Sequence, residues 1–340
     1  MLRPASIIRK TLTVSSDQLV QTSYLLNGAT LPLVIQPATL KVDLITWIQN
    51  NRRQVEDELF RHGAILFRGF GIGSAAQFEQ VIQAASSGGL MEYRERSSPR
   101  SQVSGRIYSS TDYPADQIIF PHNEHSYSHT FPMKIFFFCK TPAASGGETP
   151  IVDCRRVLDR ISAETRARFL QKRWMYVRNF GDGFGLSWQT VFQTTDRSEV
   201  EAYCRRGDIE YQWKDNDRLR TRQVRPAIAT HPKSGTAVWF NHVAFFHVST
   251  LAAETRHALM AQFEEDDLPN NTYYGDGSRI EAEVLDETRE AYRQETVTFD
   301  WRESDILMLD NMLTAHARSA FSGKREVLVG MSEPFSRERS

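Results

Sequence analysis

Two side chains that could share a metal ion lie close together in the stretch IIFPHNEHSYSH, which covers residues 118–129. An apolar run ends at Pro121 and is followed by His122 and Glu124. Side chains of an extended segment alternate with a period of two, so this imidazole and this carboxylate are expected to point to the same side. The spacing therefore predicts two ligands for one metal ion.

A third ligand must come from elsewhere in the chain. An Fe(II) oxygenase site needs two imidazoles and one carboxylate on one face of the metal, and its other positions stay open. The distant candidates are His231, His242, His247 and His316. His316 is the best of them, because the apolar stretch DILMLDNMLTAHARSAF indicates a strand and a turn that end at this histidine.

An arginine follows the third candidate ligand. GKREVLVGM predicts a returning strand with Arg325 at its start, nine residues beyond His316. A hairpin of that length would bring the guanidinium back beside the metal. There its planar fork could hold a carboxylate through two parallel hydrogen bonds.

The elements around these residues are mainly short strands. The pattern predicts an amphipathic helix over residues 44–60, a buried strand over 63–70 and a helix that begins at the N-cap Ser74. Further helices are expected near 198–205, across 252–266 and within 274–292. Strands are expected at 133–141, 174–180, 235–241, 295–301, 305–311 and 325–331. Many strands with helices on one side favour a β-sandwich or jelly roll.

Two segments have a different character. Residues 1–40 carry short β-branched runs that predict N-terminal edge strands. Residues 86–117 are rich in Ser, Gly, Pro and Arg and lead directly into His122. Unstructured loops longer than about 12–15 residues are usually functional or disordered, so we expect a mobile active-site loop here.

Composition excludes several classes of protein. The chain has 340 residues, of which 40% are hydrophobic and 24% charged, enough for one large domain or two modest ones. Its 41 basic and 42 acidic residues give a net charge of -1, which predicts neither a nucleic-acid partner nor a membrane partner. No signal peptide or membrane-spanning run is evident, and three scattered cysteines indicate free thiols, so a cytoplasmic location is expected.

The order of short motifs in the chain resembles a known family. These motifs are PHNEHSY, GGETPIVD, RNF followed by LSWQTVF, then HP, VWFN, YGDG and LMLDNMLTAHARSAFSGKREVLVGM. Together they resemble the TauD/TfdA family of Fe(II)/2-oxoglutarate-dependent dioxygenases, and within it the SyrP-like and clavaminate-synthase-like amino-acid hydroxylases. The resemblance extends from about residue 60 to 335.

The resemblance implies a fold and a set of site residues. The fold is α+β or mainly β, a double-stranded β-helix (a cupin-like jelly roll) flanked by helices, in a single domain over residues 1–340. The metal ligands are His122, Glu124 and His316, and Arg325 and Thr149 bind 2-oxoglutarate. The interval from His316 to the arginine is short for the family, so Arg318 stays an alternative anchor. Fe(II), 2-oxoglutarate and O2 are the expected cofactor and co-substrates.

The resemblance also implies a reaction. We expect hydroxylation of an aliphatic C–H bond in an amino acid or amino-acid-derived metabolite of secondary metabolism, either free or presented on a carrier protein, with release of succinate and CO2. Glu124 stands where most relatives have Asp, which resembles the clavaminate-synthase side of the family. Related halogenases leave this carboxylate position empty, so its presence favours hydroxylation or desaturation over halogenation. The alternatives are a TauD-like oxygenase of a sulfonate or other small organic acid and, in a different class, an inert cupin-like protein that binds metal or ligand.

Candidate substrate contacts are less specific. Asn123 points to the opposite face from its neighbours on an ideal strand, but irregular backbone at a site could turn it toward a substrate. The basic side chains of the segment before the metal motif belong to Arg94, Arg96, Arg100 and Arg106. They could attract a carboxylate or the phosphate of a carrier arm, or simply be a solvated loop surface.

Overall fold

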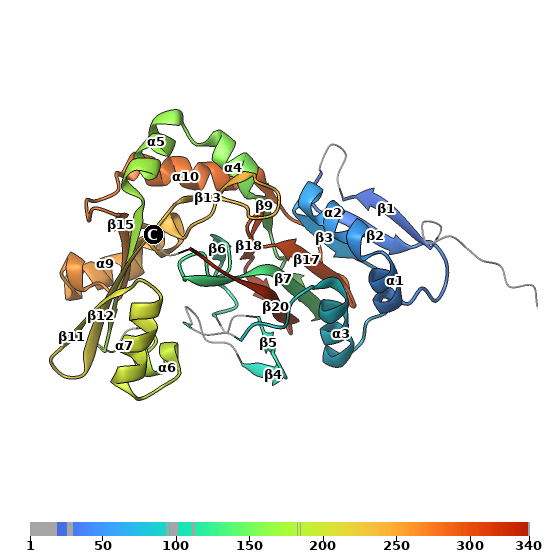
Figure 1. The fold of residues 1–340 in the computed structure, drawn as a ribbon, viewed down its shortest axis with the longest axis horizontal. Coiled ribbons are helices and arrows are strands. Elements are labelled where there is room, and N and C mark those ends of the chain that lie inside the picture. The colour runs from blue at the N-terminus through green and yellow to red at the C-terminus, as the bar shows by residue number, and fades with distance from the viewer. Residues whose placement is uncertain are drawn as a thin grey trace, which may run out of the picture.

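The core of the protein is a sandwich of two β-sheets, with helices on its outer side and a second lobe beside it (Figure 1). The structure is a computed structural model, which describes residues 19–25, 30–92, 95, 101–110, 113–181, 183 and 185–338. This architecture is the predicted double-stranded β-helix with flanking helices.

The larger sheet has eight strands, and all of its pairs are antiparallel except the parallel pair that joins its second and third strands. In spatial order the strands are β1 (Val20–Tyr24), β2 (Leu33–Pro37), β3 (Ala64–Phe67), β17 (Ile306–Asp310), β7 (Thr130–Thr141), β20 (Glu326–Ser336), β5 (Ile107–Ser109) and β4 (Gln102–Ser104). The C-terminal strands β17 and β20 lie on either side of β7 in its centre, and β17 also pairs with β3 from the N-terminal part, so the N- and C-terminal parts of the chain share one sheet.

The smaller sheet faces the larger one and is fully antiparallel. Its strands, in order, are β16 (Thr296–Val297), β9 (Ile151–Asp153), β18 (Thr314–Arg318) and β6 (Ile119–His122). The strand MKIFFFCKT shows why the layers form. Ile135 and Phe137 of β7 point into the space between the sheets, and Phe136 and Phe138 point outward, as the period of two requires.

Three helices cover the outer face of the large sheet: α1 (Leu44–Asn50), α2 (Arg52–His62) and α3 (Ala75–Ala85). The predicted N-cap is confirmed, because the Ser74 side chain accepts a hydrogen bond from the amide of Gln77. The single helix predicted over residues 44–60 is wrong. It is two helices that meet at Asn51, whose backbone leaves helical geometry (φ -121°, ψ 25°) and whose amide side chain caps the carbonyl of Trp47.

The second lobe is an insertion between β9 and β16. It contains a four-stranded sheet and a hairpin, with helices packed around them. Its strands are β10 (Trp174–Phe180), β11 (Glu210–Lys214), β12 (Arg218–Arg225), β15 (Asn270–Tyr274), β13 (Ile228–Thr230) and β14 (Ala237–Trp239), and its helices are α4 (Cys154–Arg160), α5 (Ala163–Lys172), α6 (Trp188–Phe192), α7 (Arg197–Arg206), α8 (Val243–Phe246), α9 (Ala253–Gln262) and α10 (Ala282–Glu295). Short 3-10 turns lie at Val248–Thr250 and Glu265–Asp267, and β8 (Ser145–Gly146) pairs with β19 (Phe321–Ser322).

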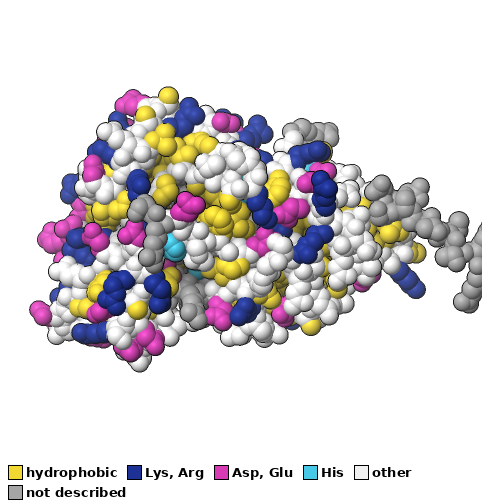
Figure 2. Space-filling view, viewed as in Figure 1, with side chains coloured by type: hydrophobic (Ala, Val, Ile, Leu, Met, Phe, Trp, Pro, Cys, Tyr) yellow, Lys and Arg dark blue, Asp and Glu magenta, His cyan; other side chains and the backbone are white. Residues whose placement is uncertain are grey.

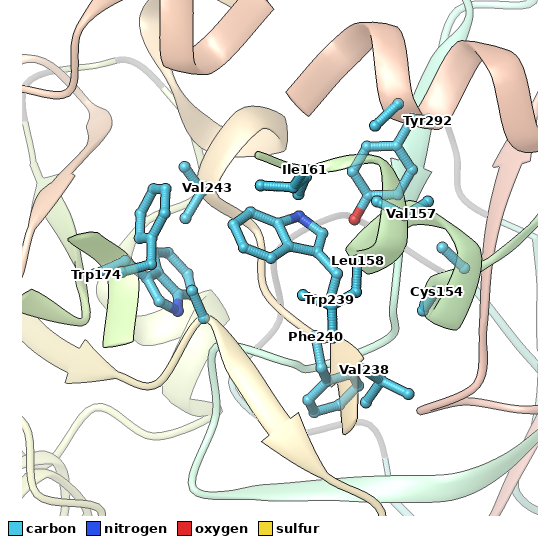
Figure 3. Packing of buried hydrophobic residues seen from close by; sticks show 14 of the residues in the cluster. Cys154, Val157, Leu158, Ile161, Trp174, Val238, Trp239, Phe240, Val243 and Tyr292 are labelled. Carbon is cyan, nitrogen blue, oxygen red and sulfur yellow. The ribbon is translucent and has the colours of Figure 1, made fainter. Parts of the chain in front are cut away.

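A continuous apolar cluster fixes this lobe to the double-stranded core. Figure 3 shows Trp239 at its centre, with Ile161 and Val157 of the α4 region and Tyr292 of α10 around it. The same cluster includes Leu313 beside the small sheet. The lobe therefore has a defined position relative to the core strands.

A buried ion cluster joins the helical layer to the large sheet. Lys134 of β7 is 3% exposed, and its ammonium group lies 2.5 Å from a carboxylate oxygen of Glu56 and 2.9 Å from one of Glu333. Burial alone would raise the pKa of Glu333, but Lys134, the amide of Ser87 and Lys233 outweigh it and lower this pKa to about 2. Glu333 is therefore charged at neutral pH.

The unbroken loop predicted over residues 86–117 is wrong in part, because β4 and β5 lie within it. Ile107 is fully buried under α3, so an apolar side chain anchors this segment at the sheet edge. The strand predicted at 295–301 is shorter than expected and comprises only β16. Within the described ranges, no helix is both long enough and apolar enough to cross a membrane.

Candidate metal centre

Two histidines from neighbouring strands face each other in the small sheet. His122 is the last residue of β6 and pairs directly with His316 in the middle of β18. Their ring centroids are 4.4 Å apart. Glu124 lies just beyond the end of β6, and one possible ligand atom from each of the three residues lies within 4.8 Å of the others. The structure thus brings together the three residues named as metal ligands.

The surroundings of the two histidines fix the orientation of their rings. Nδ1 of His122 lies 2.9 Å from the carbonyl oxygen of Phe120, so it is the protonated nitrogen and the lone pair of Nε2 is left for a metal. The ring of Phe245 packs against His122 at 4.7 Å, and that of Phe137 packs against His316 at 4.9 Å. Both imidazoles therefore have fixed orientations.

The backbone of Glu124 is clamped by one side chain from the opposite sheet. The amide oxygen of Asn311 accepts from the Glu124 N–H, and the amide nitrogen of Asn311 donates to the Glu124 carbonyl, each at 2.8 Å. The same nitrogen donates to the carbonyl of Pro132. Asn311 is fully buried, so this clamp holds the carboxylate residue where β6 has already ended.

This donor set fits iron. Two imidazoles and one carboxylate on one side, with Glu124 at 2% and His316 at 4% exposure, match the facial arrangement of non-haem Fe(II) oxygenases. A buried carboxylate between imidazoles is also costly without a cation to neutralise it. The residues present therefore suit a divalent metal.

A small cavity opens beside the histidines, with about 380 Å³ of empty space when the adjoining open solvent is included. It is lined by Ser110, Ile119, His122, Phe137, Thr149, His316, Ala317, Arg318, Arg325 and Val329. Figure 2 shows histidine atoms at the surface in the region between the two lobes. The wall of the cavity thus combines two arginines, two histidines and two hydroxyl groups with four apolar side chains.

Arg325 is held rigidly at the cavity. Its Nε donates to the carbonyl of Gly147 at 2.8 Å, and its terminal nitrogens donate to the hydroxyls of Ser110 at 3.1 Å and Thr149 at 3.5 Å. A guanidinium has five N–H groups, so one on each terminal nitrogen has no partner among the described residues. Burial, and then the nearby charge of Arg318, lower the pKa of Arg325 to about 10. It remains a cation at neutral pH and can bind an anion.

Thr149 is oriented by the same contacts. Its hydroxyl oxygen accepts from the indole N–H of Trp301 at 3.1 Å and from Arg325. A hydroxyl has two acceptor positions and one proton. Because both acceptor positions are used, the proton of Thr149 is left to be donated to a ligand in the cavity.

Arg318 has a different set of partners. Its terminal nitrogens donate to three backbone carbonyls, of Tyr113 at 3.0 Å, Pro114 at 2.5 Å and Gln117 at 2.8 Å. These contacts fix the chain that leads into β6. Arg318 therefore supports that segment, although it also lines the cavity and its Nε–H has no hydrogen-bond partner among the described residues.

Other residues named from the sequence lie away from the cavity. Asn123 is fully buried, and its amide donates to the carbonyl of Asn311 at 2.7 Å, so its position supports the strand end and not a substrate contact. His231 bonds Asp310 at 3.0 Å. Arg94, Arg96 and Arg100 lie outside the described residues, and Arg106 extends along the surface toward Glu92.

Two remaining histidine candidates have structural partners. His247 contacts the hydroxyl of Ser249 at 2.7 Å. His242 bonds the hydroxyl of Ser126 at 2.5 Å, and its ring stacks on Phe246 beside the metal centre. Burial, followed by the charge of His122, lowers the pKa of His242 well below its usual range, so it is a neutral part of the wall.

Sequence reasoning missed three residues of the site: Ser110, Trp301 and Asn311. Ser110 follows β5, in a segment that shows no strand period over its length. Trp301 stands in a run that indicated a strand but is irregular. Asn311 directly follows the run LMLD. A polar residue at the end of a buried strand, next to the strand that carries a ligand, is the one signal that could have identified it.

Comparisons with known proteins agree with this geometry. The profile of the family described as "Taurine catabolism dioxygenase TauD, TfdA family" matches residues 28–332. A dapdiamide synthesis protein, DdaC, of Enterobacter agglomerans is 40% identical over 280 residues, covering 82% of this chain and 85% of that protein. A clavaminate synthase-like protein of Arabidopsis thaliana is 29% identical over 319 residues, covering 88% and 93%.

The fold is also found among solved structures. PvcB of Pseudomonas aeruginosa superimposes with a TM-score of 0.56 at 16% identity, covering 94% of this chain and 93% of that one. A second structure of PvcB is described as an Fe, alpha-ketoglutarate dependent oxygenase from an isonitrile synthetic pathway. At 16% identity, this similarity shows a shared fold and does not by itself show a shared activity.

Proposed function

The chain belongs to the TauD, TfdA family of dioxygenases, and we propose that His122, Glu124 and His316 hold its Fe(II). The observation that supports this assignment most directly is the grouping of three possible ligand atoms from two neighbouring strands and the turn after one of them. The enzyme is an iron- and 2-oxoglutarate-dependent oxygenase, as the family implies. The alternative of an inert cupin-like protein is not retained.

We propose that Arg325 and Thr149 bind the carboxylate of 2-oxoglutarate that lies away from the metal. Arg325 offers one N–H from each terminal nitrogen, and Thr149 offers its proton. A planar guanidinium with two N–H groups in parallel matches a carboxylate. Ser110 and Trp301 would act as positioning residues, since each fixes one member of this pair.

When bound by these residues, Fe(II) would supply the oxidation of an unactivated C–H bond by O2, coupled to conversion of 2-oxoglutarate to succinate and CO2. The side chains around the site orient the proposed ligands and limit their contact with water. Phe137 and Phe245 pack on the two histidines and keep water from their outer faces. Retention of Glu124 as the carboxylate ligand favours transfer of oxygen, or desaturation, over halogenation.

For the substrate, we propose an aliphatic carbon of an amino acid or of a metabolite derived from one. The support is similarity: DdaC is named for dapdiamide synthesis, and the Arabidopsis relative is named as clavaminate synthase-like. A biosynthetic role in secondary metabolism follows for this chain as part of the proposal. A cytoplasmic setting is also inferred, and it agrees with the three buried, free cysteines.

Succinate release in the presence of Fe(II), 2-oxoglutarate and O2 tests the proposed function. A panel of free amino acids, their amides and thioester-tethered forms should raise succinate release above the substrate-free rate for at least one member. A sulfonate such as taurine belongs in the same panel, because stimulation by it alone would favour the small-organic-acid alternative. Comparison of each free compound with its tethered form tests delivery on a carrier protein.

A further inference from the structure

The two carboxylate oxygens of Glu124 face different histidines. Oε2 lies 3.9 Å from Nε2 of His316, and Oε1 lies 3.6 Å from Nε2 of His125. Glu124 is 2% exposed and His125 is 1% exposed, so both contacts are sheltered from bulk water. The two oxygens thus have different surroundings within the protein itself.

The backbone at His125 explains how neighbouring side chains come to lie together. Consecutive residues of a strand point to opposite faces, so His125 would point away from Glu124 if β6 continued. Instead His125 adopts φ +57°, in the left-handed region that residues other than glycine rarely occupy. The turn brings the imidazole back beside the preceding carboxylate. Such strained positions are kept where the surroundings fix them, and the clamp of Asn311 on Glu124 does so here.

His125 is not placed as a fourth ligand. The ligand atoms that group together are those of His122, Glu124 and His316. The Nε2 of His125 approaches Oε1, whereas the other oxygen faces His316. Its position is that of an outer partner, of the kind that orients a metal-bound carboxylate through a hydrogen bond.

We propose that His125 is a positioning residue that donates its Nε2–H to Oε1 of Glu124 and so presents Oε2 alone to the metal. This inference rests on the metal site proposed above. A distance of 3.6 Å is longer than a hydrogen bond, but such bonds often tighten only when a site is filled. A carboxylate that binds through one oxygen occupies one coordination position, which keeps the remaining positions for 2-oxoglutarate and O2.

Two substitutions separate the hydrogen bond from other roles of the side chain. His125→Gln keeps an N–H donor near the position of Nε2, and His125→Leu removes it. Neither side chain eases the left-handed backbone, so both variants carry the same conformational cost. His257→Leu, at an exposed position of α9, is the matched control for loss of an imidazole.

The measurement is titration of each full-length protein with Co(II) alone, followed by visible absorption without 2-oxoglutarate. His125→Leu is expected to weaken Co(II) binding by roughly 10–100-fold, the range for loss of an outer-shell partner. His125→Gln should stay within about threefold of the unmodified protein, and His257→Leu should match it. The melting temperatures of the metal-free Leu and Gln variants should agree, because both lose the same packing.

Three results would overturn the inference. Co(II) affinity in His125→Leu equal to that of the unmodified protein would remove any positioning role. Equal losses in the Leu and Gln variants would mean that the ring acts through packing and not through its N–H. No Co(II) or Fe(II) binding by the unmodified protein would instead overturn the metal site itself, so the two failures are distinguishable.

Discussion

Replacement of Arg325 tests the co-substrate site most sharply. Arg325→Ala removes the two N–H groups that face the cavity, and Arg325→Lys keeps the charge but loses the planar fork. The three contacts of Arg325 with Gly147, Ser110 and Thr149 hold the guanidinium in place, so little ordering is needed when an anion binds. Affinity for 2-oxoglutarate should therefore depend strongly on this side chain.

The size of the effect follows from hydrogen bonds to a charged group, each of which contributes about 1.5–3 kcal/mol. Loss of two such bonds, partly replaced by water in the space left by alanine, should cost about 3 kcal/mol, or roughly 150-fold in affinity. Lysine can restore the charge and one bond, so Arg325→Lys should lose roughly tenfold.

The assay is an anaerobic titration of the Fe(II) protein with 2-oxoglutarate, followed by the weak visible charge-transfer band of the complex. The concentration of 2-oxoglutarate at half-maximal succinate release gives a second, independent measure of the same affinity. Co(II) affinity, measured without 2-oxoglutarate, should stay within about threefold of the unmodified protein, because Arg325 touches none of the three ligands.

Arg318→Ala is the control that can refute this reasoning. Its guanidinium donates to the carbonyls of residues 113, 114 and 117, so its loss should loosen that segment and weaken 2-oxoglutarate binding by less than the Arg325 variant. If Arg325→Ala left the affinity unchanged while Arg318→Ala lowered it roughly 150-fold, the anchor would be Arg318.

Three further outcomes are expected. His316→Ala should abolish turnover and reduce Co(II) affinity by more than the roughly 100-fold upper range of outer-shell changes, as measured by titration. Trp301→Phe keeps an aromatic ring but removes the N–H that orients Thr149, so half-saturation with 2-oxoglutarate should rise about fivefold while Co(II) affinity is unchanged. The pKa of Glu333 is about 2 in the folded protein and near 4.5 in the unfolded chain. The charged carboxylate therefore stabilises the folded state above pH 4.5, and this stabilisation is lost as the pH falls toward 2. Unfolding by denaturant across this range should therefore show a loss of about 3 kcal/mol that Glu333→Gln lacks.

The grouping of the three proposed metal ligands was predictable in part, because some of its signals are local. The spacing of His122 and Glu124 singled out the pair, although β6 ends at His122 and Glu124 lies in the following turn, and the apolar pattern of the C-terminal strands pointed to His316. The helix that begins at Ser74 was equally clear, since its N-cap and apolar period agree. These are positions where local preference and tertiary structure lead to the same answer.

The strands β11 and β12 were not predicted, and the reason is their polar interior. Burial alternates along RLRTRQVR as a strand requires, but the buried positions include Thr221, Gln223 and Arg225. Gln223 donates to Glu95, and Arg225 donates to the carbonyl of Tyr127, so the buried face is a hydrogen-bonded network. A search for apolar alternation cannot detect such a strand.

The contacts that orient the ligands could not be predicted either. Asn311 acts through a buried amide whose partners are backbone groups of a segment far away in the chain. The turn at His125 depends on a single left-handed residue that no repeating pattern indicates. Both depend on tertiary contacts of high sequence separation.

The pairing of β6 with β18 also determines when the metal can be acquired during protein synthesis. His122 and Glu124 leave the ribosome before the second lobe, and the strand that carries His316, the third proposed ligand, follows that lobe. A nascent or truncated chain that lacks β18 holds only two ligands and cannot complete the site. Because metal affinity requires a folded ligand set, iron uptake through the proposed ligands can follow only after β18 has been synthesised and has paired with β6.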